Sequence, residues 1–422
     1  MKAFRSRIFH YLNRNKFEYF EDGLLIIKNG LVDKLGPYQD VIKLLDPQVE
    51  IVDERDKILM PGFIDAHVHA VQTKVIASYG ADLLDWLNKY TFPEESRFDD
   101  EEYTHKQIDF FYKQLLKNGT TTAAIYPSVH EASLAALADE AINLNMRVLA
   151  GKTHMDRNAP KHLCEITENT FQSSYNLIKR YDGKLRFNYV LTPRFAITSS
   201  SSQLEELQKL KMEFPAIRIQ THISENDGEI ESTMKLFPER KNYLDVYDYY
   251  SLIDDKSLLG HSIHFSEDEW NRVKEKGASL VHCPTSNLFL GSGLFDLKKA
   301  WESNIPVALG SDVGGGTSFS MLKTAAAAYQ VATLRGYKPT ALQLFYLLSL
   351  GGAKALNLDH KIGNFEQGKE GDFVLLNPAN IEILANRLIG VKDIEEMLFA
   401  MLFLGDERIV DSVYLMGKYQ NL

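Results

Sequence analysis

The feature that most constrains the fold is an eightfold alternation in the middle of the chain. Between about Pro61 and Leu358, each short apolar run is followed by a stretch with helical hydrophobic periodicity. Near-continuous apolar runs are typical of parallel strands that are buried on both faces. Eight such units in succession predict an α/β protein with a (β/α)8 barrel of the TIM type. The expected strands cover 62–67, 121–126, 147–151, 186–191, 217–222, 257–261, 278–282 and 306–312.

The two ends of the chain differ in character from the middle. Residues 24–30, 371–378 and 409–417 are strand-like runs, rich in aliphatic, β-branched or aromatic residues, that end at turn-forming residues. They predict a small composite β-sandwich domain built from 1–58 and 365–422, with the barrel over 59–364. Within the barrel, Ser202 with Glu205 and Ser266 with Glu269 have the spacing of helix capping boxes.

Composition excludes several classes of protein. The chain has 422 residues, 45% hydrophobic and 25% charged, as in soluble globular proteins. Its net charge of −10 argues against a nucleic-acid partner. The longest apolar run, 397–405, is half of the ~18 residues that a membrane span needs, and the first residues lack a signal-peptide core. We therefore expect a cytoplasmic protein that binds neither nucleic acid nor membranes. Two cysteines make a disulfide framework unexpected.

Residues of metal-ligating types stand at the ends of four expected strands. His67 and His69 alternate on the first strand, so both side chains face the same way. His222 and His261 close the fifth and sixth strands, and Asp312 follows the eighth. A lone histidine at such a position is more often a packing residue. The whole set at the strand ends of a barrel predicts one bound metal ion, Zn²⁺ or Fe²⁺, with an open position for water.

Other polar residues near the expected strand ends leave alternatives open. His264 competes with His261 for the role at the sixth strand. His154 and His282 either line the pocket or pack in the core. Lys152 follows the third strand, but no spacing suggests a carboxylated lysine between two metals, so one ion is expected.

Glu225 lies three residues beyond His222. This spacing predicts a carboxylate above the metal that moves protons without binding the ion, although taken alone it also suits the first turn of a helix. The chain contains no His-Glu-x-x-His motif, no Pro-Cys-x-x-Cys motif of cytidine-type deaminases and no P-loop. The favoured chemistry is therefore attack by a metal-activated water.

The segment PGFIDAHVH at 61–69 resembles the first-strand motif of the amidohydrolase superfamily, and the resemblance extends over essentially the whole chain. Further segments resemble the guanine deaminases within that superfamily. The most specific of them are WLNKYTFP at 86–93 and TPRF at 192–195. The others are LKNGTTT at 116–122, QTHISE at 220–225, HCPTSNL at 282–288 and GSDVGG at 310–315.

The resemblance implies a homodimeric enzyme that binds one Zn²⁺ per chain and hydrolyses guanine to xanthine and ammonia. The resemblance implies that the metal ligands are His67, His69, His222 and Asp312. It implies that Glu225 is the proton shuttle and that His261 polarises the reacting group. The implied guanine-binding residues are Gln72, Arg194 and Phe195. We expect Asp312 also to orient the attacking water. A guanidinium fork suits a ring carbonyl, and a carboxamide suits an amide-like edge. Trp86 and Phe92 either pack against the purine or belong to the core.

Two competing functions remain. Deaminases of 8-oxoguanine, adenosine-like nucleosides or triazines use the same constellation, although a nucleoside also needs space and partners for its ribose. Some barrels of the superfamily are non-catalytic scaffolds that have lost metal ligands. A scaffold is disfavoured because every ligand position is filled in this chain.

Overall fold

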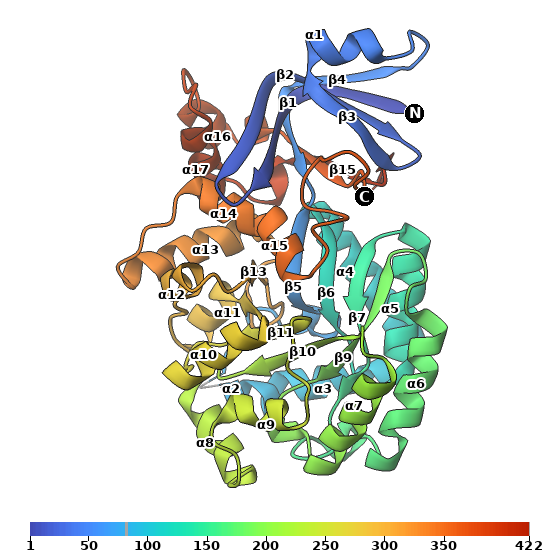
Figure 1. The fold of residues 1–422 in the computed structure, drawn as a ribbon, viewed down its shortest axis with the longest axis vertical. Helices are drawn as coiled ribbons and strands as arrows, with labels where there is room; N and C mark the ends of the chain where they lie inside the picture. The colour runs from blue at the N-terminus through green and yellow to red at the C-terminus, as the bar shows by residue number, and fades with distance from the viewer. Residues whose placement is uncertain (81–82, 422) are drawn as a thin grey trace.

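The computed structural model describes residues 1–80 and 83–421. Its larger part is a parallel barrel surrounded by helices (Figure 1). The barrel strands are β5 (Phe63–His69), β6 (Thr120–Tyr126), β7 (Arg147–Ala150), β9 (Phe187–Pro193), β10 (Arg218–Ile223), β11 (Ser257–His261), β12 (Ser279–His282) and β13 (Val307–Leu309), with the short β8 (Thr153–His154) beside β9. Each of the eight predicted strands is present within a few residues of its expected bounds, so the predicted fold class is confirmed.

The barrel closes between β5 and the segment that follows β13. The Asp312 backbone N–H donates to the His67 carbonyl at 2.8 Å, and the His69 N–H donates to the Val313 carbonyl at 2.9 Å. Asp65, fully buried on β5, accepts from the Ser311 backbone N–H at 2.9 Å and from its hydroxyl. These bonds hold the end of β13 against β5, so residues on the two strands meet at one rim.

The barrel interior is filled by apolar side chains. They are Ile64, Ala66, Ala124, Leu149, Val190, Leu258, Val281 and Ala308, all buried. Because these side chains carry no polar groups, polar chemistry in this fold belongs at the ends of the strands.

Helices cover the outside of the barrel, except α1, which lies at the other end of the molecule beside the N-terminal strands. Their bounds are α1 (Tyr38–Val41), α2 (Leu83–Trp86), α3 (Phe92–Glu95), α4 (Glu101–Lys117), α5 (Glu131–Leu144), α6 (Thr170–Tyr181), α7 (Ser201–Glu213), α8 (Asp227–Leu236), α9 (Tyr243–Tyr249), α10 (Glu267–Lys276), α11 (Pro284–Phe289), α12 (Leu297–Glu302), α13 (Met321–Leu334), α14 (Ala341–Leu348), α15 (Leu350–Ala355), α16 (Glu382–Arg387) and α17 (Ile394–Leu404). The predicted capping box of Ser266 and Glu269 begins α10. The one predicted at Ser202 is wrong, because α7 begins two residues earlier and its cap is Ser200, whose hydroxyl accepts from the Gln203 N–H at 3.1 Å.

Strands from both ends of the chain form a second, seven-stranded sheet at one end of the molecule (Figure 1). Its order is β16 (Lys418–Tyr419), β15 (Val410–Leu415), β14 (Phe373–Leu376), β4 (Ile51–Pro61), β1 (Lys2–Asn13), β2 (Lys16–Lys28) and β3 (Leu31–Pro37). The ring centroids of Phe4 on β1 and Phe373 on β14 are 4.8 Å apart although β4 lies between these strands, so the sheet curls around a core of its own. The division into 1–58 with 365–422 and 59–364 stays a prediction, and its last residue, Leu422, lies outside the described residues.

Buried ion pairs join this sheet to the barrel at the beginnings of the barrel strands. Arg186 contacts Glu370 at 2.9 Å and Asp372 at 2.5 Å, and Arg147 also pairs with Glu370. This joint lies at the opposite end of the strands from His67 and Asp312. None of the helices in the described ranges has both the length and the hydrophobicity needed to cross a bilayer.

Candidate metal centre and purine pocket

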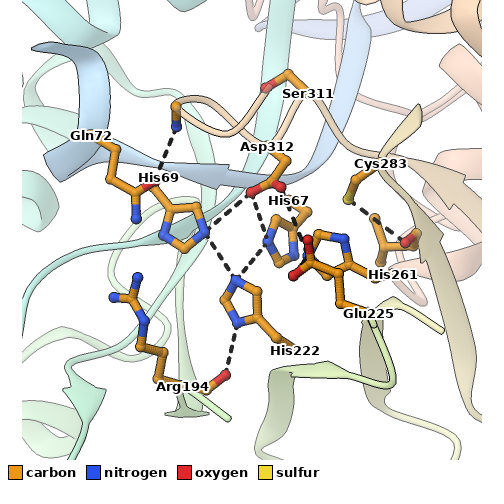
Figure 2. Close-up of polar contacts among 12 residues, drawn as sticks. His67, His69, Gln72, Arg194, His222, Glu225, His261, Cys283, Ser311 and Asp312 are labelled. Carbon is orange, nitrogen blue, oxygen red and sulfur yellow. Dashed lines mark hydrogen bonds and ion pairs between the residues drawn. The ribbon is translucent and has the colours of Figure 1, made fainter. Parts of the chain in front are cut away.

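Three imidazoles and one carboxylate converge where the barrel strands end (Figure 2). We call His67, His69, His222 and Asp312 the metal cluster. The Nε2 atom of His222 lies 3.2 Å from that of His67 and 3.1 Å from that of His69, and both of those nitrogens lie 3.3 Å from Asp312 Oδ1. Ligands placed 2.0–2.1 Å from an ion at the corners of a tetrahedron are roughly 3.3–3.4 Å apart. The spacing of the cluster therefore fits a single ion.

The protonation of these groups supports the same fit. Burial lowers the pKa of His67 to about 4 and that of His222 well below its usual value, so the rings are neutral and their lone pairs converge. Burial alone would raise the pKa of Asp312, but His67 and His69 outweigh it and hold that pKa well below its ordinary range. Neutral imidazoles with an ionised carboxylate are the donor forms that a divalent ion binds.

Small residues let the strands approach closely enough to build the cluster. A Cβ atom on Gly260 would lie 2.8 Å from the His67 ring, and one on Gly310 would lie 2.6 Å from His67 Cβ. The backbone at Asp312 and His261 has φ values of 50° and 66°, a region that non-glycine residues rarely occupy. The strand ends are thus bent to aim these two side chains at the centre.

His261 lies on the far side of the cluster from Arg194. Its Nε2 is 3.8 Å from Asp312 Oδ2 and 3.6 Å from Glu225 Oε2, and its Nδ1 bonds Asn287 Oδ1 at 2.8 Å. Burial alone would lower the pKa of His261, but the charges of Glu225 and Asp312 raise it above its usual value. A second possible ligand set has His261 in place of His69. Its members are His67, His222, His261 and Asp312, and one ligand atom from each lies within 4.8 Å of the other three.

Glu225 is buried beside the cluster and is held by three contacts. Its Oε1 accepts from the Ser292 hydroxyl at 2.8 Å, its Oε2 faces His261, and its backbone N–H donates to Glu229 at 2.7 Å. Burial raises the pKa of the Glu225 carboxyl, with the Asp312 charge adding to the effect and His261 opposing it. A raised pKa suits a group that takes up and releases a proton.

The alternative at the sixth strand is resolved by the position of His264. Its ring is 30% exposed, and its Nε2 donates to the Ser292 carbonyl at 2.7 Å rather than facing the cluster. His264 therefore holds the turn that carries Ser292, while His261 reaches the centre. The sequence did not single out Ser292 as a partner of Glu225, since the contact joins residues 67 positions apart.

Three members of the metal cluster, His69, His222 and Asp312, line one end of a cavity together with Glu225 and His261. Its wall includes Gln72, Trp86, Arg194 and Phe195, together with Leu83, Leu87, Leu290 and Gly315. Phe92, the remaining predicted substrate contact, is not among the lining residues. It lies behind the wall, with its ring centroid 5.7 Å from the Arg194 guanidinium carbon. One cavity thus joins the predicted recognition residues to the predicted reactive ones.

Glu95 connects two of these recognition residues and was missed by the sequence analysis. It is fully buried on α3 and accepts from Gln72 Nε2 at 2.8 Å and from Arg194 Nη1 at 2.7 and 2.8 Å. The Gln72 oxygen accepts from the Gly314 N–H at 3.1 Å. The only signal in the sequence was the pair of carboxylates, Glu94 and Glu95, that follows the segment 86–93, since a buried arginine needs a counter-ion.

A second buried polar cluster is joined to Arg194 through the backbone, since the Arg194 N–H donates to the His154 carbonyl at 3.2 Å. We call Lys152, His154 and Glu165 the Glu165 cluster. Glu165 pairs with the Lys152 ammonium and accepts from His154 Nδ1 at 2.8 Å. His154 therefore belongs to this cluster and not to the cavity wall. His282, the other open alternative, stacks on Phe295 with ring centroids 4.7 Å apart, and burial lowers its pKa to about 3.

Comparison with known proteins places the chain in a family. A model of the Amidohydrolase family matches residues 58–419. The chain belongs to the amidohydrolase family. Among amidohydrolases, the guanine deaminase of Escherichia coli (strain K12) is 44% identical over 400 residues, which cover 95% of this chain and 91% of that protein.

Solved amidohydrolase structures agree with this likeness. The structure of E. coli guanine deaminase matches with a TM-score of 0.98 at 42% identity and covers 100% of this chain and 99% of that one. A guanine deaminase from C. acetobutylicum, with guanine bound in its active site, matches with a TM-score of 0.90 at 31% identity over 100% of both chains. The predicted resemblance to guanine deaminases is confirmed.

Proposed function

We propose that this amidohydrolase deaminates guanine, converting guanine and water into xanthine and ammonia. The observation that carries the proposal is one cavity in which Gln72 and Arg194 face the His and Asp donors of the metal cluster. A planar purine placed between them would put its polar edge on the recognition residues and its amino-bearing carbon beside the cluster. The similarity to guanine deaminases over nearly the whole chain supports this choice of purine.

We propose that the metal cluster holds one Zn²⁺ per chain, with Fe²⁺ as the alternative. Nitrogen-rich donors with one carboxylate suit either ion. An ion held there would lower the pKa of a water bound to it toward about 7, which would supply a nucleophile at neutral pH.

Recognition of guanine falls to Arg194 and Gln72. Arg194 donates to the O6 carbonyl, since a guanidinium offers several N–H groups in one plane. Gln72 both donates and accepts along the neighbouring edge. Phe195 and Trp86 enclose the ring and keep bulk water from the reacting carbon. The assignments give each polar edge of the base a partner, which is how a buried pocket discriminates between bases.

The proton transfers fall to three side chains. Glu225 delivers a proton to ring N3, which makes C2 more electrophilic. Asp312 orients the attacking water and accepts its proton. His261 donates to the oxygen on which negative charge develops at C2. Asp312 then passes the proton taken from water to the amino group, which leaves as ammonia, while the C2 hydroxyl gives its remaining proton to Glu225 and becomes the C2 carbonyl of xanthine.

We further propose that the enzyme acts in the cytoplasm as a homodimer, as the resemblance implies. Sedimentation of the purified chain tests the dimer directly. A mass of one chain across the working concentration range would contradict it.

A substrate panel tests the activity itself. The purified chain, with its metal content measured on the same preparation, is incubated with guanine, 8-oxoguanine, adenine, adenosine, cytosine and a triazine. Ultraviolet absorbance and ammonia release are followed together. We expect guanine to be consumed with one ammonia per base and a kcat/KM well above that of the others. Turnover of another compound without turnover of guanine would contradict the proposal.

A further inference from the structure

The recognition end of the pocket contains a buried ion pair. Glu95 touches both Gln72 and Arg194, and neither Glu95 nor Arg194 is more than 4% exposed. The negative charge of Glu95 therefore cancels the positive charge of Arg194 at the place where the purine carbonyl would bind. The other titratable side chains that line the cavity are His69, His222, His261, Glu225 and Asp312, all at its metal end.

We propose that Glu95 is a positioning residue that makes the recognition end of the pocket neutral, so that the pocket selects uncharged purines over anionic purines of the same shape. This inference rests on the proposed function, because it assumes that a purine binds at Arg194. Without Glu95, a buried Arg194 would be an uncompensated cation and would favour an anionic base.

Glu95 also fixes the orientation of the Gln72 amide. An ionised carboxylate only accepts hydrogen bonds, so Gln72 must turn its Nε2 toward Glu95. Its Oε1 then faces the Gly314 N–H. A flipped amide would set oxygen against the carboxylate and N–H against N–H. The amide therefore presents one fixed pattern of donor and acceptor to the purine.

The geometry leaves Arg194 able to serve both partners. Both Glu95 oxygens accept hydrogen bonds from Arg194 Nη1, so Glu95 does not use Arg194 Nη2 or Nε. The Phe92 ring centroid lies 5.7 Å from the Arg194 guanidinium carbon, so an aromatic ring also neighbours the cation. Charge compensation and purine binding thus use different atoms of one side chain.

The neighbouring carboxylate provides a matched control. Glu94 lies on the same helix, α3, but pairs with Arg97 at 3.1 Å and with the Tyr103 hydroxyl, and it does not line the cavity. Glu94→Gln and Glu95→Gln remove one charge each from adjacent positions. Only the second removes it from beside Arg194.

The test compares two purines that differ in charge, and it follows how the ratio of their affinities changes between variants. Urate is an anion at pH 7.5 and hypoxanthine is neutral. Both carry a carbonyl at C6, and neither has the 2-amino group that is hydrolysed. Their dissociation constants are measured by calorimetry on the metal-loaded enzyme. We expect Glu95→Gln to shift the ratio of the two constants toward urate by about tenfold or more, while Glu94→Gln leaves it within about twofold.

A conservative variant separates charge from shape. Glu95→Asp keeps the charge but shortens the side chain, so we expect the wild-type ligand ratio together with a lower kcat/KM for guanine. A purely structural role would instead leave the ratio unchanged in Glu95→Gln as well, and that result would overturn the proposal.

A reversed variant keeps the test valid if Glu95→Gln does not fold. Arg194→Gln leaves the Glu95 charge uncompensated, so the ratio should shift away from urate, and an unchanged ratio there overturns the proposal. Failure of the proposed function is a separate result, since it would appear as wild-type enzyme that does not consume guanine. The ligand ratios do not depend on turnover.

Discussion

The two buried polar clusters of this barrel contain similar types of side chain but differ in how their charges are balanced. The Glu165 cluster contains its own cation, so the Glu165 carboxylate meets the Lys152 ammonium and a histidine N–H. The metal cluster has a carboxylate and three neutral rings whose nitrogens face one another at 3.1–3.2 Å, with no cationic side chain between them. The first is electrically complete within the chain. The second directs several ring lone pairs and a carboxylate at one point, which favours a cation supplied from outside, and this difference distinguishes a structural cluster from a reactive one.

The largest expected effect breaks the metal cluster. His222→Ala should reduce bound metal from one ion per chain to near zero and lower kcat/KM for guanine by more than about 10⁴-fold, because the chain then lacks the group that makes water reactive. Elemental analysis and the ultraviolet assay measure both quantities. His264→Ala is the matched control and should keep one ion per chain, since its ring faces Ser292. Full metal content in His222→Ala would refute the ligand assignment.

The second prediction concerns proton transfer beside a cluster that remains intact. Glu225→Gln should lower kcat by about 10²–10⁴-fold, because an amide cannot carry a proton to the ring. Metal content should not change. Glu231→Gln, on the exposed part of α8, should leave kcat within about twofold. Near-normal turnover in Glu225→Gln would show that another group shuttles the proton.

The third prediction breaks the Glu165 cluster. Glu165→Gln leaves the Lys152 ammonium buried without its counter-ion, which should lower the free energy of unfolding by about 3–5 kcal/mol. Urea unfolding measures the change, and Glu168→Gln on the exposed surface nearby is the control. The bound metal should remain. If the stability of Glu165→Gln equalled that of wild type, the cluster would not stabilise the fold as described.

The fourth prediction follows the same cluster with pH. Burial alone would raise the pKa of Glu165, but His154 and Lys152 outweigh it and lower that pKa from 4.5 to about 2. A lowered pKa in the folded state means that the stabilisation is fully present above pH 4.5 and is lost as the pH falls toward 2. The stability difference between wild type and Glu165→Gln should therefore be constant above about pH 5 and shrink below it. A difference that grows on acidification would reverse the sign of this argument.

The barrel strands were predictable because a strand buried on both faces must be apolar along its whole length. The same logic located His67, His222 and Asp312, which interrupt or end such runs. The start of α7 was misplaced because serines at 199–202 offer several equivalent caps, and the choice among them depends on how the helix packs.

The contacts that finish the site could not be read from the sequence. Glu95 meets Arg194 across 99 positions, and Ser292 meets Glu225 across 67. A backbone turn with positive φ at His261 decides whether His261 or His264 faces the centre. The residue pattern does not predict this turn. Local periodicity therefore predicts where a strand ends, whereas the pairing of buried side chains from distant segments appears only in three dimensions.

The position of β4 between β1 and β14 has a consequence for synthesis on the ribosome. The edge of β4 that pairs with β14 has no partner until Phe373–Leu376 has emerged, long after the His-x-His strand that directly follows β4. An exposed strand edge is prone to pair with other chains. The nascent polypeptide thus carries its first two ligand histidines next to an open edge for most of its translation, and shielding by a chaperone during that interval would favour correct assembly.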